Sequence, residues 1–229
     1  MVSKTTQNPL LEFLALVPEP LRTQVYRQRT EVHRGENRRT LIDEDIPSTD
    51  VFFLREGEAE VRLYPLHRPD IVYLHTLRPG DVFGEIAALD GKGRSANVEA
   101  LSEVVADVLR ANDFIACLHS SPAAGIWLAQ RMAASVRRLS EKVFELTALN
   151  VSARIHCELL RLAATGERAG NCIVVDPAPN QTELAKRVGT SREAVTRELG
   201  YLSDRKILEY ARPKLVFIDL KALERLTQR

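Results

Sequence analysis

Hydrophobic and polar positions follow three different spacing patterns along the chain. Between Leu10 and Arg29 the apolar residues recur at helical spacing, which predicts a short N-terminal helix. From Thr30 to Arg110, short apolar runs are separated by Gly, Pro and Asp, and residues 59–64 alternate between apolar and polar side chains. This texture is typical of many short strands that fold into a sandwich or barrel.

A long helix is expected to begin at Ser121-Pro122, because Ser is a good N-cap and Pro is favoured at the first helical position. Apolar residues then follow a strict 3-4 spacing, the seam of a two-stranded coiled coil. The seam consists of Ala129, Met132, Val136, Leu139, Val143, Leu146 and Asn150. The pattern also fits one amphipathic helix packed on its own domain, but its regularity and length favour self-association. Asn150 either fixes the register or ends the seam.

The last third of the chain predicts a helical hairpin followed by a β-hairpin. A helix follows Asn150 and runs to about Ala164, and a loop over residues 166–179 includes a strand at 173–175. Residues 180–204 then form two short helices joined at Gly189, with capping boxes at Asn180/Glu183 and Thr190/Glu193. Residues 208–220 predict a hairpin that turns at residues 212–214. Together these elements are a winged helix-turn-helix pattern.

The second of these helices begins with side chains suited to DNA. Arg192 and Arg197 match guanine edges, and Glu193 can accept a hydrogen bond from cytosine N4. Residues 178–214 contain eight Lys or Arg and five Asp or Glu, so the local charge is only mildly positive. A solvated helix face is the alternative interpretation. The predicted DNA-binding residues are Thr182, Thr190, Ser191, Arg192, Glu193, Thr196, Arg197, Lys206 and Lys214.

A candidate anion site lies in residues 83–100, FGEIAALDGKGRSANVEA. Gly84 allows the backbone to approach a ligand closely, and residues 85–89 can form one helical turn whose free N–H groups bind an anion. Arg94 is a planar cation suited to phosphate oxygens, and Ser95 adds a hydroxyl. Glu85 places a carboxylate beside this cationic site, which suits an anionic ligand that also carries a hydroxyl. The alternative is an ordinary hairpin with one surface arginine.

This stretch resembles the phosphate-binding cassette of cyclic-nucleotide-binding domains, F-G-E-x-A-x-L followed by a short loop and R-S-A. Residues 191–197, SREAVTR, resemble the recognition helix S-R-E-x-V-x-R of the catabolite activator protein (CRP/FNR) family. The resemblance covers essentially the whole chain and implies an α+β fold. The implied parts are an N-terminal double-stranded β-roll over residues 1–120, a dimerisation helix over 121–150 and a C-terminal winged helix-turn-helix over 151–229.

The resemblance also implies roles for individual residues. Arg94 and Ser95 would bind the cyclic phosphate, and Glu85 would accept from the ribose 2′-hydroxyl. The implied ligand-binding residues are Gly84, Glu85, Ile86, Ala87, Arg94, Ser95, Leu139 and Ser140. The chain departs from the family where Leu139-Ser140 replaces Thr-Ser, and where Ser135 replaces an arginine. These departures leave the choice between cyclic AMP and cyclic GMP open.

The expected partners are double-stranded DNA with TGTGA-type half-sites, a second copy of the chain, and RNA polymerase. Ala194 and Thr196 depart from the family's recognition helix and leave half-site detail open. The expected cofactor is a cyclic nucleotide, cAMP or cGMP, without a metal.

No apolar run approaches the roughly 18 residues that cross a bilayer, so no membrane partner is expected. Three widely spaced cysteines without a signal peptide indicate reduced thiols and a cytoplasmic location. The net charge of +1 means that DNA binding must rest on a local patch.

Three other classes compete with this interpretation. A haem sensor on the same scaffold needs an axial ligand, such as His67 or His75, and an iron–sulfur sensor needs clustered cysteines, whereas none precedes Cys117. A cyclic-nucleotide-binding regulatory subunit would not need the helix-turn-helix. An enzyme would need a nucleophile–base pair or a metal motif such as HExxH, and the sequence shows neither. A binding protein without catalytic residues is therefore expected.

Overall fold

The computed structural model describes residues 8–35, 39–64 and 71–227. The chain divides into two compact units, residues 1–137 and 138–229, and each is treated by itself. The first unit contains α1 (Pro9–Ala15), α2 (Leu21–Gln28), β1 (Thr30–Arg34), β2 (Thr40–Ile42), β3 (Val51–Glu56), β4 (Ala59–Leu63), β5 (Val72–Leu77), β6 (Val82–Phe83), α3 (Glu85–Asp90), β7 (Asn97–Ala100), β8 (Val104–Leu109) and α4 (Ala111–Ser120). Helix α5 (Pro122–Ala148) crosses the boundary.

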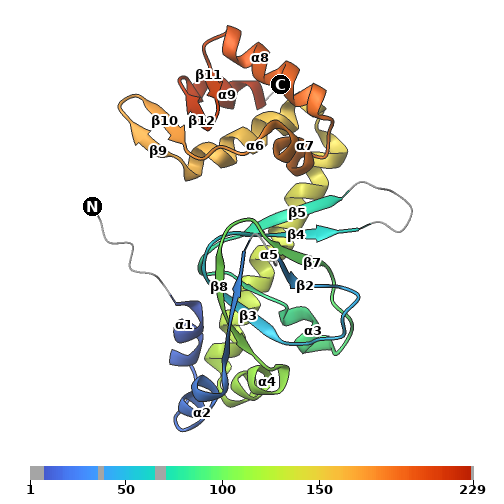
Figure 1. The fold of residues 1–229 in the computed structure, drawn as a ribbon, viewed down its shortest axis with the longest axis vertical. Coiled ribbons are helices and arrows are strands. Elements are labelled where there is room, and N and C mark those ends of the chain that lie inside the picture. Colours follow the sequence, from blue (N-terminus) through green and yellow to red (C-terminus); the bar gives the residue numbers. More distant parts are fainter. Residues whose placement is uncertain (1–7, 36–38, 65–70, 228–229) are drawn as a thin grey trace. The chain divides into compact units, whose positions relative to one another are not determined.

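Two antiparallel four-stranded sheets form the body of the first unit (Figure 1). Their strand orders are β1-β8-β3-β6 and β2-β7-β4-β5. The inner sides share one apolar core, to which Leu54 contributes from β3, Val61 from β4 and Val98 from β7. Val61 lies opposite Val98 on one side and His75 on the other. The predicted α+β fold with an N-terminal strand-rich domain is thus confirmed.

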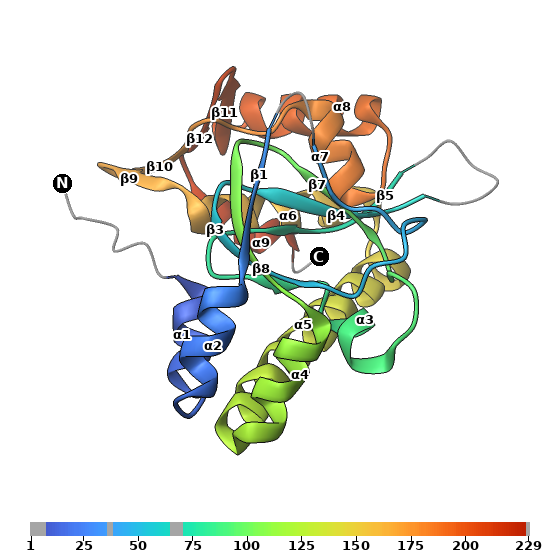
Figure 2. The ribbon, with the colours of Figure 1, turned by 60° about the horizontal axis from the view of Figure 1, so that its bottom comes forward.

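A second core lies on the outer side of the β1-β8-β3-β6 sheet, under helices α1, α2, α4 and the start of α5 (Figure 2). Aromatic rings dominate it: the centroid of Phe13 lies 5.2 Å from Phe114 and 5.0 Å from Trp127. Phe53 of β3 joins them, 6.5 Å from Trp127. Because alternate β3 side chains enter different cores, this strand is apolar along most of its length.

The N-terminal helical pattern forms two helices rather than one. Helix α1 ends at Ala15 and α2 begins at Leu21. Pro18 and Pro20 lie between them, and a proline inside a helix removes a backbone hydrogen bond and clashes with the preceding turn. The prediction of one helix from Leu10 to Arg29 was therefore wrong, because the helix is interrupted between Ala15 and Leu21.

Helix α5 begins where the capping signal predicts, with the Ala124 backbone N–H donating to Ser121 Oγ at 3.4 Å. The seam positions point away from the chain's own cores: Val136 is 61% exposed and Val143 is 60% exposed. Packing on its own domain therefore does not account for the repeat. Asn150 ends the seam, because its side chain accepts from the Ala153 N–H at 2.9 Å and caps the next helix.

The second unit packs its helices against a small sheet. Its elements are α6 (Val151–Thr165), β9 (Glu167–Ala169), β10 (Cys172–Val175), α7 (Gln181–Val188), α8 (Arg192–Asp204), β11 (Leu208–Ala211), β12 (Lys214–Phe217) and α9 (Leu220–Thr227). The sheet order is β11-β12-β10-β9. The predicted β11–β12 hairpin is present, but Lys214 opens β12 instead of lying in the turn. Strand β9 and helix α9 were not predicted.

Candidate functional site

The predicted anion site is organised around Gly84, which adopts a left-handed conformation with φ of 83° and caps the N-terminus of α3. A Cβ atom at this position would lie 2.7 Å from a guanidinium nitrogen of Arg94 and 2.7 Å from the Asp50 carbonyl oxygen. Only glycine combines this backbone conformation with such close neighbours. The motif glycine is therefore required by the packing around Arg94.

The Arg94 guanidinium is buried, with 9% of the residue exposed. Its Nη1 donates to the Gly84 carbonyl at 3.0 Å, and its Nη2 donates to Ser48 Oγ at 2.8 Å and to the Asp50 carbonyl at 2.9 Å. Its buried Nε has no hydrogen-bond acceptor among the described residues. Burial lowers the pKa of Arg94, while the carboxylates of Asp50 and Glu85 act in the opposite direction. An arginine nevertheless stays protonated, so the site holds a desolvated cation.

The other predicted ligand residues are spread around this cation. Glu85 is half-buried at the start of α3, and Ser95 is exposed. Ala87 is buried in the unit, whereas Ile86 is 42% exposed. Leu139 and Ser140 are exposed residues of the second unit, and their role as ligand contacts stays a prediction. Sequence reasoning missed Ser48 and Asp50. Both accept hydrogen bonds from Arg94, lie more than 40 residues from it in the sequence and belong to no recognisable motif.

The helix-turn-helix is built as the capping signals at its start predict. Asn180 Oδ1 accepts from the backbone N–H groups of Thr182 and Glu183 at 3.0 Å, and the Glu183 side chain accepts from the Asn180 N–H at 2.6 Å. Gly189, with φ of 72°, makes the turn. Apolar residues of both helices are buried together: Leu184, Ala185, Val188, Val195, Leu199 and Leu202.

The cap of the second helix differs from the prediction. Ser191, not Thr190, is its N-cap, and Ser191 Oγ accepts from the Ala194 N–H at 3.3 Å. The predicted capping box between Thr190 and Glu193 was therefore wrong by one residue. Helix α8 consequently begins at Arg192, and both hydroxyl residues stay at its N-terminal end.

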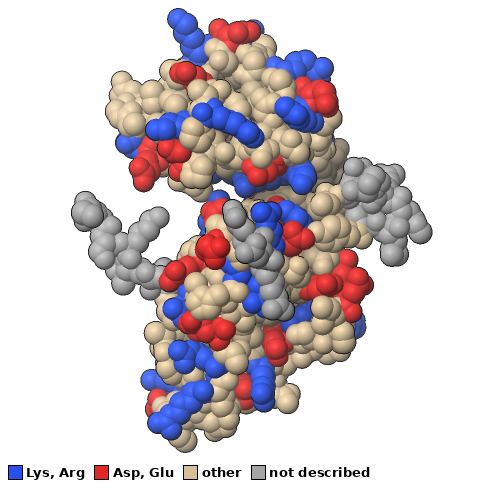
Figure 3. All heavy atoms as spheres, viewed as in Figure 1, with Lys and Arg blue, Asp and Glu red and all other residues tan. Residues whose placement is uncertain are grey.

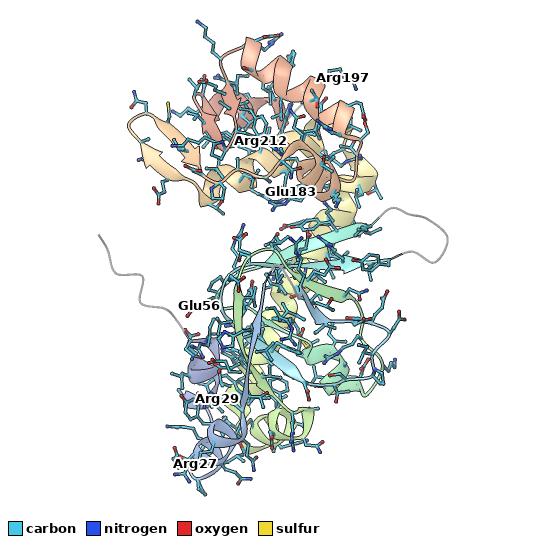
Figure 4. All side chains as sticks on the ribbon, viewed as in Figure 1. Arg27, Arg29, Glu56, Glu183, Arg197 and Arg212 are labelled. Carbon is cyan, nitrogen blue, oxygen red and sulfur yellow. The ribbon has the colours of Figure 1, made fainter. Side chains whose placement is uncertain are left out.

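The exposed face of α8 presents Arg192, Glu193, Thr196 and Arg197 side by side. Neither arginine forms an ion pair within the part of the chain that the structure describes. Hydrogen bonds from its own backbone N–H and from Ser191, together with the charge of Arg192, lower the pKa of Glu193. Glu193 is therefore an ionised acceptor between two cations. Figure 4 marks Arg197 on α8.

A surface hollow beside this face contains two predicted residues, Thr182 and Arg192. Sequence reasoning did not assign its other polar lining residues to the DNA site: Asn180, Gln181, Tyr210 and Arg212. Arg212 lies in the turn between β11 and β12 (Figure 4). Thr196 Oγ1 lies 2.7 Å from Gln181 Oε1 and ties α8 to the first residue of α7. On the face drawn in Figure 3, cationic and anionic side chains are interspersed, in keeping with the small net charge.

A buried polar network holds α8 on α6. Glu198 is reached by His156 Nε2 at 2.7 Å and by the Ser152 hydroxyl at 2.7 Å, one donor for each carboxylate oxygen. His156 is 4% exposed. The Glu198 side chain is 13% exposed, and a carboxylate so far removed from water needs such partners, because an unpaired one is unfavourable. Glu198 directly follows Arg197 in the sequence. The network therefore holds α8 in place close to Arg197.

The competing haem-sensor class had two histidines as candidate axial ligands. His67 lies outside the described residues, and His75 is a half-buried residue of β5. No group of three or more His, Cys, Asp or Glu suited to a metal ion occurs within residues 8–35, 39–64 and 71–227. Over the same ranges, no helix is long and apolar enough to cross a membrane.

Comparison with known proteins places both units in established families. The cyclic nucleotide-binding domain family matches residues 33–121, and the Crp-like helix-turn-helix domain family matches residues 153–226. Transcriptional regulator LdrP of Thermus thermophilus is 32% identical over 202 residues, 87% of this chain and 93% of that protein. The CRP-like cAMP-activated global transcriptional regulator of Mycobacterium tuberculosis is 24% identical over 188 residues, 81% and 83% of the two chains.

The fold itself matches solved structures of the same kind. A CooA mutant from Carboxydothermus hydrogenoformans superposes with a TM-score of 0.79 at 20% identity, covering 97% of both chains. Together with the matched families and the 32% identical relative, this similarity identifies the class: a DNA-binding transcriptional regulator with a cyclic-nucleotide-binding domain. The chain belongs to the CRP/FNR family. The predicted family, DNA binding and helix-turn-helix are thereby confirmed.

The buried cysteine gives a first testable prediction. Burial, with a smaller effect of Asp113, raises the pKa of the Cys117 thiol to about 11, and Cys117 is fully buried. Because the thiolate is the reactive form, we expect Cys117 not to react with Ellman's reagent at neutral pH until the protein is unfolded. Cys117→Ser should therefore leave the native thiol count unchanged and lower the unfolded count by one. A lower native count would contradict the prediction.

Proposed function

We propose that the protein is a homodimeric transcriptional regulator switched by a cyclic nucleotide, with cyclic AMP the preferred effector and cyclic GMP the second candidate. The observation that carries the proposal is the buried Arg94 cation beside Gly84 and Glu85, whose Nε has no acceptor among the residues that the structure describes. The cAMP-activated relative in Mycobacterium tuberculosis supports cyclic AMP. Leu139, in place of a residue that hydrogen-bonds the base, is the reason to test cyclic GMP.

In the proposed mechanism, the cyclic phosphate binds Arg94 and Ser95, and the ribose hydroxyl donates to Glu85. The backbone at Gly84, Ile86 and Ala87 encloses the ring, and Leu139 and Ser140 complete the site. The proposed domains are the nucleotide-binding roll over residues 1–120, the dimerisation helix over 121–150 and the DNA-binding domain over 151–229. Ligand binding shifts the dimer toward its DNA-binding state by the difference in affinity between the two states.

The proposed partners follow from the same assignment. The dimer binds a pseudo-palindromic DNA site with half-sites about one helical turn apart, and it acts on RNA polymerase. The protein releases its nucleotide unchanged and is not an enzyme. The exposed apolar stripe of α5, including Leu139 at 47% and Leu146 at 46% exposure, supports the dimer.

Nucleotide titration tests the effector. Isothermal calorimetry should show binding of cyclic AMP or cyclic GMP to the wild type. Arg94→Ala should lower the affinity by roughly tenfold or more, because a charge-assisted hydrogen bond is worth about 1.5–3 kcal/mol. Both Arg94→Ala and Glu85→Ala should abolish nucleotide-dependent DNA binding while the dimer stays folded. Lys92→Ala, an exposed cation on the same loop, is the matched control. Wild-type affinity in Arg94→Ala would refute the assignment.

Sedimentation tests the dimer. Charged substitutions at two seam positions, Leu139→Glu and Val143→Glu, should give monomers, because each would bury an unpaired carboxylate in the interface. Phe144→Glu is the matched control, since Phe144 is 61% exposed but lies off the seam. A wild-type protein that sediments as a monomer at micromolar concentration, with nucleotide present, contradicts the proposal.

Selection of DNA sites tests base readout. The half-site should contain two guanines, read by Arg192 and Arg197, and a cytosine on the opposite strand, read by Glu193, as in a TGTGA-type sequence. Arg192→Ala and Arg197→Ala should each relax the preference at one guanine, at about 1–3 kcal/mol. Lys206→Ala and Lys214→Ala should instead weaken all sites alike and reduce the salt dependence. Equal weakening of every sequence by Arg192→Ala would show that it contacts only phosphate.

A further inference from the structure

The contacts of Arg94 single out one side chain that no sequence motif contains. The two terminal nitrogens of the guanidinium are held by Gly84, Ser48 and Asp50 at 2.8–3.0 Å. Two of the three acceptors are main-chain carbonyls. Among the described residues, the hydroxyl of Ser48, in the loop between β2 and β3, is the one side-chain group that accepts a hydrogen bond from Arg94.

The three nitrogens of the guanidinium differ in their hydrogen-bond partners. Its terminal nitrogens donate to the protein, whereas the buried Nε has no acceptor in the described part of the chain. A buried N–H group without a partner is unfavourable, and an anionic oxygen that accepts from it removes the penalty. The protein contacts thus fix the plane of the guanidinium and leave one donor for a ligand.

We propose that Ser48 is a positioning residue for nucleotide binding, which holds Arg94 so that its unpaired Nε–H meets one exocyclic oxygen of the cyclic phosphate. This inference rests on the proposed function. A guanidinium already held in place loses less conformational freedom when the ligand arrives, so part of the binding energy depends on Ser48. Ser48 acts through Arg94 and does not itself touch the nucleotide.

Calorimetry on the full chain measures the effect. Ser48→Ala should weaken binding of the preferred cyclic nucleotide by about tenfold, the loss expected for one hydrogen bond to a charged group. Ser48→Thr keeps a hydroxyl and should restore affinity to within a few-fold of wild type. Thr49→Ala is the matched control, because the neighbouring hydroxyl is also half-buried. Affinity in Ser48→Ala equal to or tighter than wild type overturns the proposal, since the serine would then be irrelevant or a competitor of the phosphate.

A stereochemical probe separates positioning from general damage. The two diastereomers of the cyclic nucleotide phosphorothioate carry sulfur at one or the other exocyclic position. If Arg94 is aimed at one oxygen, the wild type should prefer one diastereomer, and Ser48→Ala should narrow that preference several-fold. Equal binding of both diastereomers by the wild type, or an unchanged preference in Ser48→Ala, overturns the assignment.

Binding by the wild type, Arg94→Ala and Ser48→Ala together separates an error in the role of Ser48 from an error in the proposed effector. If the wild type binds neither cyclic AMP nor cyclic GMP, the effector proposal fails, and the Ser48 proposal fails with it. If the wild type binds a cyclic nucleotide, Arg94→Ala loses it and Ser48→Ala binds as tightly as wild type, the effector proposal stands and only the role of Ser48 is wrong.

Discussion

The first unit depends on strand β3, whose two rows of side chains enter two different cores. On the inner side, the Phe52 ring stacks on Phe83 at 5.0 Å and lies 5.9 Å from the Arg94 guanidinium. On the outer side, Phe53 packs against Trp127 of α5. Phe52 and Phe53 are consecutive residues, so β3 contacts both the surroundings of Arg94 and the beginning of α5. The strand thus joins the candidate effector site to the first turns of the long helix.

Within the second unit, helix α8 carries a largely buried glutamate next to exposed arginines. Glu198 is anchored by His156 and Ser152 on α6, while Arg197 projects from the exposed face. An apolar contact would bury α8 equally well, but two directed hydrogen bonds fix its rotation about its own axis more narrowly. Arginine side chains that read base edges need such a fixed platform. Polar groups inside the domain thus add to the apolar core in holding α8 behind its proposed DNA-binding face.

Local signals predicted most of the fold and the core of each candidate site. The capping box at Asn180 and the glycine at position 84 act over a few residues, and the structure has both as expected. The predicted cap at Thr190 failed because Ser191 offers the same hydroxyl one residue later. Ser48 was beyond reach, since it lies 46 residues from Arg94 and only the folded sheets bring the two together. Long-range pairing of this kind leaves no periodic trace in a single sequence.

The aromatic cluster under the first unit has an optical consequence. Trp127 is the one tryptophan in the sequence, and its indole lies on α5 against Phe13 and Phe53, with the Arg131 guanidinium 4.2 Å from its ring centroid. Indole emission is quenched and shifted by nearby charge and solvent. Tryptophan emission, excited selectively over the five tyrosines, therefore reports on the N-terminal part of α5 alone, with no tryptophan background from the second unit. Rearrangement there can be followed in real time without attaching a dye.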